Sequence, residues 1–357
     1  MKAMTPEKLA LLKKGTVIPA SPLALNEDRT FSEQHQAAVY RYYVDAGAGG
    51  IAVGVHTTQF EIRDTNIGLF KPLLAFASRV IDKAAAGAGR PIIKIAGVCG
   101  QKEQAIREAE YAHEQGYDAV LLSLAALKDD NEDQMLAHCR EIARIMPVIG
   151  FYLQPAVGGR LLPFSFWRRF VEIENVVAIK MAPFNRYQTI DVVRALAYSG
   201  REDEITLYTG NDDNIIADLV TPYTFNVEGR LKTVRIKGGL LGQWSVWTKT
   251  FAELLQRIHQ ELEDGKVISR DLLEKNIQLT DANAVVFDAA HGFAGCIPGI
   301  NEVLRRQGLL PSHRCLDESL SLSPGQSEEI DRICRDYQWL IDDEFVMNNL
   351  DRWLQNG

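Results

Sequence analysis

Short apolar segments alternate with longer amphipathic segments along most of the chain. The apolar segments are rich in Val, Ile and Ala and are bounded by turn-forming residues, which is typical of buried strands. The amphipathic segments carry apolar residues at helical spacing, and the first of them lies between Ser32 and Gly47. Strands are predicted at 16–20, 51–55, 91–96, 118–123, 147–152, 176–181, 204–209 and 238–242, and further helices at 70–87, 101–116, 132–146, 164–174, 186–199, 212–221 and 247–264.

Eight strand–helix units over about 250 residues are the size and order of a (β/α)8 barrel. We therefore predict a barrel over 1–264 and a helical C-terminal extension over 265–357, packed on the barrel or on a neighbouring subunit. An open doubly wound sheet is the alternative, but no strand leads into the Gly-x-Gly-x-x-Gly of a dinucleotide site. The segment 222–235 is an insertion that forms either a surface hairpin or an extended loop.

Composition narrows the class of protein. The chain has 357 residues, 46% of them hydrophobic, and a net charge of −8, which argues against nucleic acid or an anionic membrane as a partner. No apolar stretch is long enough to span a membrane. The five cysteines are an odd number without C-x-x-C spacing, so we expect free thiols, no metal site and a cytoplasmic location.

Lys180 interrupts one of the apolar segments. Small or β-branched apolar residues precede it directly, as in a fully buried parallel strand. Burial disfavours the ammonium form, so the pKa of such a lysine falls and its free amine becomes available as a nucleophile. This pattern favours Schiff-base chemistry. The alternative is a lysine at a strand end whose stem packs while its head reaches water.

Tyr152 ends the preceding predicted strand. Neighbouring strands of a parallel barrel place the groups at their carboxyl ends on one face, so we expect Tyr152 and Lys180 to be neighbours. A phenol beside an amine can transfer the protons that carbonyl condensation requires. The alternative is a core tyrosine whose hydroxyl is tied to a local partner.

With these segments on consecutive units of one barrel, residues 15–310 resemble the dihydrodipicolinate synthase / N-acetylneuraminate lyase family. The resemblance implies a (β/α)8 barrel with a helical extension and a lysine that forms a Schiff base with pyruvate or another 2-oxo acid. Lys180 in Val-Val-Ala-Ile-Lys matches this lysine, and Tyr152 in Tyr-Leu-Gln-Pro matches the proton-relay tyrosine of the family's Tyr-Asn-x-Pro. No further cofactor is implied, because the substrate is held as a covalent imine.

The resemblance also implies a set of substrate-binding residues. The His-Thr-Thr-Gln turn after the second strand stands where the family has Gly-Thr-Thr-Gly-Glu, whose amides and hydroxyls hold the keto-acid carboxylate. Gly-Asn-Asp after the seventh strand is similar to the family's Gly-Asp-Asp, and Gly-Gly-Leu-Leu-Gly to its glycine-led eighth strand. The expected binding residues are His56, Thr57, Thr58, Asn211, Asp212 and Gly239.

Three departures argue against dihydrodipicolinate synthase itself. Val157 stands where the lysine-biosynthetic enzymes have an arginine for the aldehyde's carboxylate, and Arg160 comes three residues later. The family's Pro-Tyr-Tyr after strand four, whose second tyrosine reaches the neighbouring subunit's site, is Leu-Ala-Ala at 124–126. The Thr-Thr turn has gained His56, which is either a substitute acid/base or a turn histidine bonded to backbone.

Two functions are compatible with this pattern. The first is a class I lyase that condenses, cleaves or dehydrates a 2-oxo acid through Lys180, with Tyr152 as proton relay. The second is a family member without turnover that binds a 2-oxo acid as a sensor or regulatory protein, which the missing strand-four tyrosine favours.

A sugar acid and an aromatic aldol partner are both candidates for the rest of the substrate. We expect a homodimer or homotetramer, because the family and the apolar stripe of the C-terminal helices call for covered surface.

Overall fold

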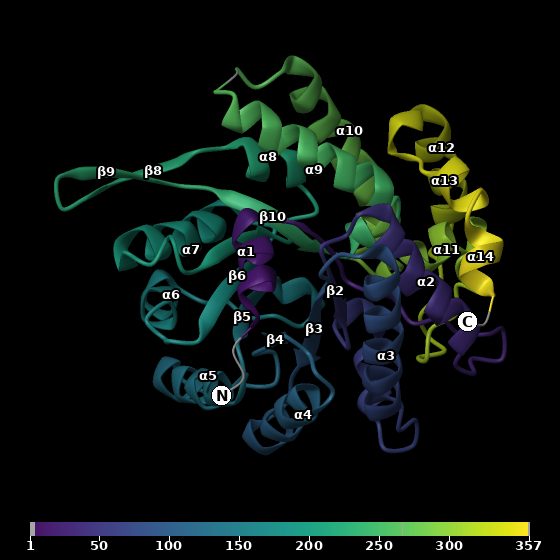
Figure 1. Cartoon of the computed structure of the whole chain (residues 1–357), viewed down its shortest axis with the longest axis horizontal. Helices are drawn as coiled ribbons and strands as arrows, with labels where there is room; N and C mark the ends of the chain where they lie inside the picture. Colours follow the sequence, from purple (N-terminus) through teal and green to yellow (C-terminus); the bar gives the residue numbers. More distant parts are fainter. Residues whose placement is uncertain (1–3, 266, 356–357) are drawn as a thin grey trace.

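The protein folds as a closed barrel of parallel strands surrounded by helices, in a computed structural model that describes residues 4–265 and 267–355 (Figure 1). The strands are hydrogen-bonded in the order β1-β10-β7-β6-β5-β4-β3-β2, and a parallel bridge between Ala20 and Ala52 joins β1 to β2. The predicted (β/α)8 barrel is confirmed. Its strands are β1 (Val17–Pro19), β2 (Gly50–Val53), β3 (Ile93–Val98), β4 (Ala119–Leu122), β5 (Val148–Leu153), β6 (Val176–Ala182), β7 (Thr206–Thr209) and β10 (Ile236–Leu241).

Eight helices form the outer layer, close to the predicted ranges. Helix α8 begins three residues later than predicted, because 212–214 form the loop that leaves β7. The helices are α2 (Glu33–Ala46), α3 (Phe70–Ala88), α4 (Lys102–Glu114), α5 (Glu132–Ile145), α6 (Phe164–Phe170), α7 (Arg186–Ser199), α8 (Ile215–Val220) and α9 (Thr248–Glu263). Short 3-10 turns follow several strands: η1 (His56–Thr58), η2 (Phe60–Arg63), η3 (Pro155–Val157) and η4 (Gln243–Ser245).

A further helix, α1 (Pro6–Lys14), lies across the barrel at the amino-terminal ends of the strands (Figure 1). Thr5 caps it by accepting a hydrogen bond from the Lys8 amide, and Pro6 suits the first helical position. Leu12 is fully buried in the inner core, and its carbonyl accepts a hydrogen bond from the Tyr208 hydroxyl at 2.8 Å. Helix α1 therefore closes the end of the barrel opposite the carboxyl ends of the strands.

Alternation along the strands divides the apolar residues into two cores. Successive side chains of a strand point to opposite faces, so one set fills the barrel and the other packs under the helices. On β5, Ile149 and Phe151 belong to the inner core, whereas Tyr152 belongs to the outer one. On β6, Ala178 and Ala182 are inward residues. This alternation decides which functional side chains meet.

The C-terminal extension packs on the barrel of the same chain. Its elements are α10 (Arg270–Val286), η5 (Ala289–His291), α11 (Cys296–Arg306), α12 (Gln326–Asp336), η6 (Gln338–Leu340), α13 (Asp343–Met347) and α14 (Leu350–Leu354). Helix α14 lies against α2, where the indole of the fully buried Trp353 donates to Asp45 at 2.7 Å (Figure 1). Ile330, Ile333 and Leu340 are also buried. The predicted apolar stripe is thus buried within the chain, with α12 against α10 and α11 and α14 against α2, and the homo-oligomer stays a prediction from the family resemblance alone.

The insertion at 222–235 is an antiparallel hairpin of β8 (Tyr223–Val227) and β9 (Arg230–Val234), which projects beside α7 (Figure 1). Its two-residue turn, Glu228 and Gly229, has φ values of 51° and 83°. Positive φ at both turn positions matches the twist of a two-residue hairpin. Of the two predicted alternatives, the surface hairpin is the one adopted.

Three further observations bear on the class of protein. Within residues 4–265 and 267–355, the helices are too short or too polar to cross a lipid bilayer. All five cysteines are free thiols, as their number and spacing predicted. The same residues include no group of three or more His, Cys, Asp or Glu side chains placed to hold a metal ion.

Candidate active site

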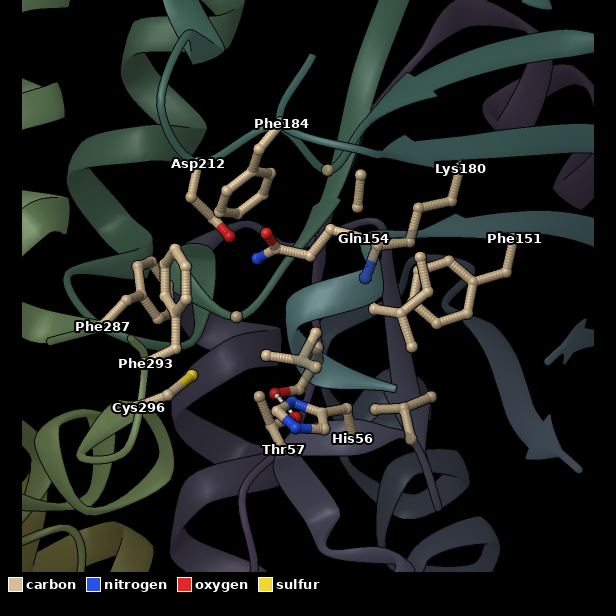
Figure 2. A pocket seen from close by; sticks show the side chains of 17 residues that line it. His56, Thr57, Phe151, Gln154, Lys180, Phe184, Asp212, Phe287, Phe293 and Cys296 are labelled. Atoms are coloured by element: carbon tan, nitrogen blue, oxygen red, sulfur yellow. Dashed lines mark hydrogen bonds between the residues drawn. The ribbon is translucent and has the colours of Figure 1, made fainter. Parts of the chain in front are cut away.

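A cavity lies at the carboxyl ends of the strands, where loops from six strands and the C-terminal extension meet (Figure 2). Active sites of (β/α)8 barrels occur at this end. Polar groups reach the cavity from β2, β5, β6 and β7. The residues that line it are Ala20, Val55, His56, Thr57, Phe151, Leu153, Gln154, Val157, Lys180, Ala182, Phe184, Gly210, Asp212, Gly242, Phe287, Phe293 and Cys296.

Lys180 extends from β6 into this cavity, as the sequence predicted. The residue is 8% exposed, and its Nζ lies 4.5 Å from the centroid of the Phe151 ring. Among the described residues, the amine makes no hydrogen bond and no ion pair within 4 Å. Burial lowers the pKa of Lys180, and the negative charge of Asp212 opposes that shift. Gly210 leaves room for the side chain, since a Cβ there would lie 2.7 Å from the Lys180 Cε.

Asp212, in the loop after β7, is another ionisable group in the cavity. Its backbone carbonyl accepts a hydrogen bond from the side-chain amide of Asn283 on α10 at 2.7 Å, which ties this loop to the C-terminal extension. The carboxylate atom Oδ1 is shielded from solvent and has no hydrogen-bond partner in the described part of the chain. Burial raises the pKa of Asp212, and the nearby Lys180 opposes the rise. The two groups therefore form a buried acid and base facing one cavity (Figure 2).

The turn η1 after β2 supplies two of the predicted binding residues. His56 and Thr57 line the cavity, and the Thr57 hydroxyl donates to the Ala20 carbonyl at 2.6 Å. Burial and the nearby Lys180 lower the pKa of His56 to about 4, so the imidazole is neutral near pH 7. Thr58 does not line the cavity: its hydroxyl donates to the Ser21 carbonyl at 2.7 Å and holds the turn in place.

Tyr152 does not lie beside Lys180, and this part of the prediction is wrong. Its side chain points away from the barrel interior into the outer core, 1% exposed, with its ring centroid 5.3 Å from that of Trp167. Its hydroxyl accepts a hydrogen bond from the Leu162 amide at 3.2 Å. The core tyrosine with an occupied hydroxyl, stated above as the alternative, is the one present.

An extra residue in β6 causes this difference. Val148 pairs with Val176, and continuing that register along the two strands would pair Tyr152 with Lys180. The register shifts by one residue after this first pair, so that Phe151 pairs with Lys180 instead. Because side chains alternate with a period of two, a shift of one residue moves Phe151 rather than Tyr152 to the face that carries the amine.

Two other predicted binding residues are structural. Asn211 is fully buried, and its amide donates to Thr189 at 3.1 Å and to Asp218 at 2.9 Å, while its Oδ1 accepts from the Phe184 amide. Gly239 does not line the cavity, and a Cβ there would lie 2.7 Å from the Trp244 ring. Asn211 therefore shapes the loop after β7, and Gly239 makes room for a core indole.

Several cavity residues were not predicted from the sequence. Gln154 follows β5 directly and lies at a strand end, which is a signal that could have identified it. The C-terminal extension contributes Phe287, Phe293 and Cys296, which are far along the chain from the other site residues. No local sequence pattern predicts that they line the cavity. The residues missed are Phe151, Gln154, Phe184, Phe287, Phe293 and Cys296.

The chain is thus a (β/α)8 barrel with a buried lysine in the cavity at the carboxyl ends of its strands. The chain belongs to the Dihydrodipicolinate synthetase family, whose family model matches residues 13–333. The predicted family resemblance is confirmed.

Curated relatives match over part of their length. The chain is 30% identical over 132 residues to a 4-hydroxy-tetrahydrodipicolinate synthase of Thermoanaerobacter sp. (strain X514), covering 36% of this chain and 42% of that protein. It is 26% identical over 176 residues to one of Desulforudis audaxviator (strain MP104C), covering 48% of this chain and 54% of the relative. The matches thus span about half the length of these relatives.

Solved structures share the fold at low identity. A prophage protein of the dihydrodipicolinic acid synthase family from E. coli K12, solved in complex with pyruvate, superposes with a TM-score of 0.73 at 16% identity, covering 91% of this chain and 99% of that one. N-acetylneuraminate lyase from Fusobacterium nucleatum superposes with a TM-score of 0.69 at 15% identity, with the same coverage. At these identities the likeness is one of fold.

Proposed function

We propose that this protein is a class I lyase that acts on a 2-oxo acid such as pyruvate through an imine on Lys180. The observation that carries the proposal is the amine of Lys180, which lies in the cavity without a hydrogen bond or ion pair among the described residues and has its pKa lowered by burial. A buried amine without a hydrogen-bond acceptor is poorly stabilised as an ammonium ion, which favours the nucleophilic free base. Family membership and the pyruvate complex of a structural neighbour support the same chemistry.

The first step would join Nζ of Lys180 to the C2 carbonyl carbon of the oxo acid. The carbonyl oxygen takes up protons and leaves as water, and a protonated imine forms. That cation withdraws electrons from C3, so that a bond at C3 can form or break, and water later hydrolyses the imine. No cofactor beyond this covalent link is needed in the proposed reaction.

Asp212 is the group we assign to the proton transfers. It faces the same cavity as Lys180, its Oδ1 has no hydrogen-bond partner among the described residues, and burial raises its pKa toward the range of a working acid/base. Tyr152 is not proposed for this role, because its hydroxyl is engaged with Leu162 outside the cavity. His56, neutral near pH 7, is a further hydrogen-bonding group on the cavity wall.

The carboxylate of the oxo acid would bind at the turn η1. His56 and Thr57 line the cavity there, and the Thr57 side chain is fixed by its bond to the Ala20 carbonyl. A fixed turn orients its backbone amides before substrate arrives, which reduces the entropy cost of binding. Thr58 supports the turn from behind through Ser21.

A second candidate function is a binding protein without turnover. It is favoured by the outward position of Tyr152 and by the Leu-Ala-Ala segment at 124–126, which leave the cavity without a tyrosine relay. Such a protein would hold a 2-oxo acid, as an imine or noncovalently, without releasing a product.

Reductive trapping tests the proposal. The protein is incubated with pyruvate, reduced with borohydride and digested, and the modified peptide is located by mass spectrometry. We expect one adduct, on Lys180. No adduct with pyruvate or longer 2-oxo acids, or an adduct on another lysine, would contradict the proposal. An adduct on Lys180 without any aldol cleavage, condensation or dehydration would favour the binding protein.

A further inference from the structure

Three phenylalanines form an aromatic wall of the cavity, which we define as Phe184, Phe287 and Phe293. Phe287 and Phe293 come from the C-terminal extension and lie across the cavity from Lys180 (Figure 2). Phe184 follows β6, and its ring meets that of Phe293 edge to face, with centroids 5.8 Å apart. A second hollow shares these three rings and Asp212 with the cavity, and its other lining residues are Asp213, Thr280, Asn283, Ala284 and Ala289. The apolar surface therefore continues outward from the reacting amine.

Two of these rings are held in an unfavourable backbone conformation. Phe184 has a φ of 50° and Phe293 a φ of 70°, a region that bulky residues rarely occupy. The Phe184 amide donates to the side chain of Asn211 at 3.1 Å, and the Phe293 amide donates to the Asp288 carbonyl at 2.9 Å. The Asp288 carboxylate also accepts from the Gly295 amide. Strain that is held by specific hydrogen bonds is characteristic of functional sites.

The charges in the cavity disfavour an acidic second substrate. Among the described residues that line it, Lys180 is the one basic side chain that can pair with an anion, and the imine would occupy it. Val157 lines the cavity, whereas the guanidinium of the nearby Arg160 donates to the carbonyls of Leu127 and Asp130. A second carboxylate would be buried beside Asp212 without a partner, which is unfavourable.

The wall also disfavours a polyhydroxylated substrate. A sugar buries several hydroxyl groups, and each one needs a hydrogen-bond partner to offset its loss of water. Phenyl rings offer none, whereas they pack well against another aromatic ring in an edge-to-face or offset arrangement. Apolar walls with a few polar groups that fix the reacting atoms are typical of sites for small uncharged ligands.

We infer that the second substrate is an uncharged aromatic aldehyde, seated on the aromatic wall while its carbonyl faces Asp212. This inference rests on the proposed function, since it concerns the step after the imine has formed. C3 of the pyruvate-derived enamine bonds to the aldehyde carbon, and the aldehyde oxygen takes up one proton in place of the one that left C3. Water then hydrolyses the imine, which frees the amine of Lys180 and a 4-aryl-4-hydroxy-2-oxobutanoate.

A comparison of three aldehydes tests the inference. The full-length protein is given pyruvate with benzaldehyde, with glyceraldehyde as a polyol, or with glyoxylate as an acid, and the aldol products are quantified by mass spectrometry. We expect kcat/KM for benzaldehyde to exceed those for the other two at least about tenfold, because differential burial of apolar groups gives about 10–200-fold discrimination. Equal or lower kcat/KM for benzaldehyde would overturn the inference.

Variants of the aromatic wall test whether its rings cause the preference for benzaldehyde. Phe293→Gly and Phe184→Gly remove a ring at positions whose φ suits glycine, so both should fold, and each should reduce the benzaldehyde preference about tenfold. Tyr187→Ala removes a ring that is 83% exposed and should leave the preference unchanged. An unchanged preference in both glycine variants would overturn the inference.

Borohydride trapping with pyruvate alone, run on every variant, separates the two proposals. A trapped Lys180 adduct together with no benzaldehyde preference would contradict the aromatic substrate and leave the lyase proposal in place. Absence of the adduct in the wild-type protein would contradict the lyase proposal itself.

Discussion

Two buried lysines on barrel strands have opposite environments. Lys94 on β3 is 3% exposed, and its amine donates to Ser78 at 2.8 Å and to Asp82 at 2.7 Å, both on α3. Lys180 on β6 is 8% exposed, and its amine lies over the face of Phe151, near the charge of Asp212, without a hydrogen bond or ion pair within 4 Å among the described residues. Lys94 points outward to the helices, whereas Lys180 points into the cavity.

The comparison shows that burial alone does not mark a reactive lysine. Both residues interrupt short apolar strands, and the local sequence Ile-Ile-Lys-Ile-Ala around Lys94 is as apolar as that around Lys180. A buried ammonium ion is stable where acceptors and a carboxylate surround it, and becomes a nucleophile where they are missing. The partners of the amine, rather than its exposure, distinguish the structural lysine from the proposed catalytic one.

Replacing each lysine in turn should give the largest difference in formation of the pyruvate adduct. Lys180→Met should abolish the borohydride-trapped pyruvate adduct, because it removes the proposed nucleophile. Lys94→Met should leave the adduct on Lys180, since Lys94 lies outside the cavity and its partner Asp82 is largely solvated. Peptide mass spectrometry of both variants is the measurement. An adduct that persists in Lys180→Met would contradict the assignment of Lys180 as the nucleophile.

Replacing the carboxylate near each lysine should also affect aldol turnover differently. Asp212→Asn should lower aldol turnover by about 10²–10⁴-fold, the usual effect of losing a general acid/base, while the imine with pyruvate is still trapped. Asp82→Asn is the matched control and should leave turnover unchanged, because its carboxylate pairs with Lys94 outside the cavity. Equal turnover in wild type and Asp212→Asn, measured with excess pyruvate, would rule out the proton-transfer role of Asp212.

The pH dependence of imine formation tests whether the pKa of Lys180 is lowered and whether Asp212 affects it. Burial lowers the pKa of Lys180, and the free amine is the nucleophile, so the rate should rise with pH and level off below the ordinary lysine pKa of about 10.4. The Asp212 charge raises the pKa of Lys180, so the rise in Asp212→Asn should move to lower pH. Initial trapping rates across a pH series would measure both. A rise centred on the ordinary lysine pKa would indicate a solvated amine.

The smallest effect is expected at Tyr152. Tyr152→Phe should change the trapping rate by no more than about twofold, because its hydroxyl does not reach the cavity, but should cost about 1 kcal/mol of unfolding free energy through the lost Leu162 hydrogen bond. If Tyr152 were instead the proton relay that the sequence predicts, its loss would slow adduct formation by about 10²–10⁴-fold. Chemical denaturation and trapping would be measured on the same sample. A large loss of trapping rate at an unchanged free energy of unfolding would instead support a catalytic role for Tyr152.

The architecture and the position of the nucleophile could be predicted from the sequence. Continuous apolar strands alternating with amphipathic helices require a parallel sheet covered on its outer face, and eight such units close into a barrel. The location of Lys180 at the carboxyl end of β6 followed from the same pattern, because its strand is apolar up to the lysine. These features depend on local periodicity, which a single sequence contains.

Only the tertiary structure decided which side chains meet at the site. One skipped residue in the pairing of β5 with β6 turned Tyr152 outward and set Phe151 against Lys180, and local pattern does not specify register to one residue. The aromatic wall depends on Phe287 and Phe293, which reach the cavity only because the C-terminal extension folds back over the carboxyl ends of the strands. Such contacts between distant segments arise from packing of the whole chain, and no periodicity within either segment encodes them.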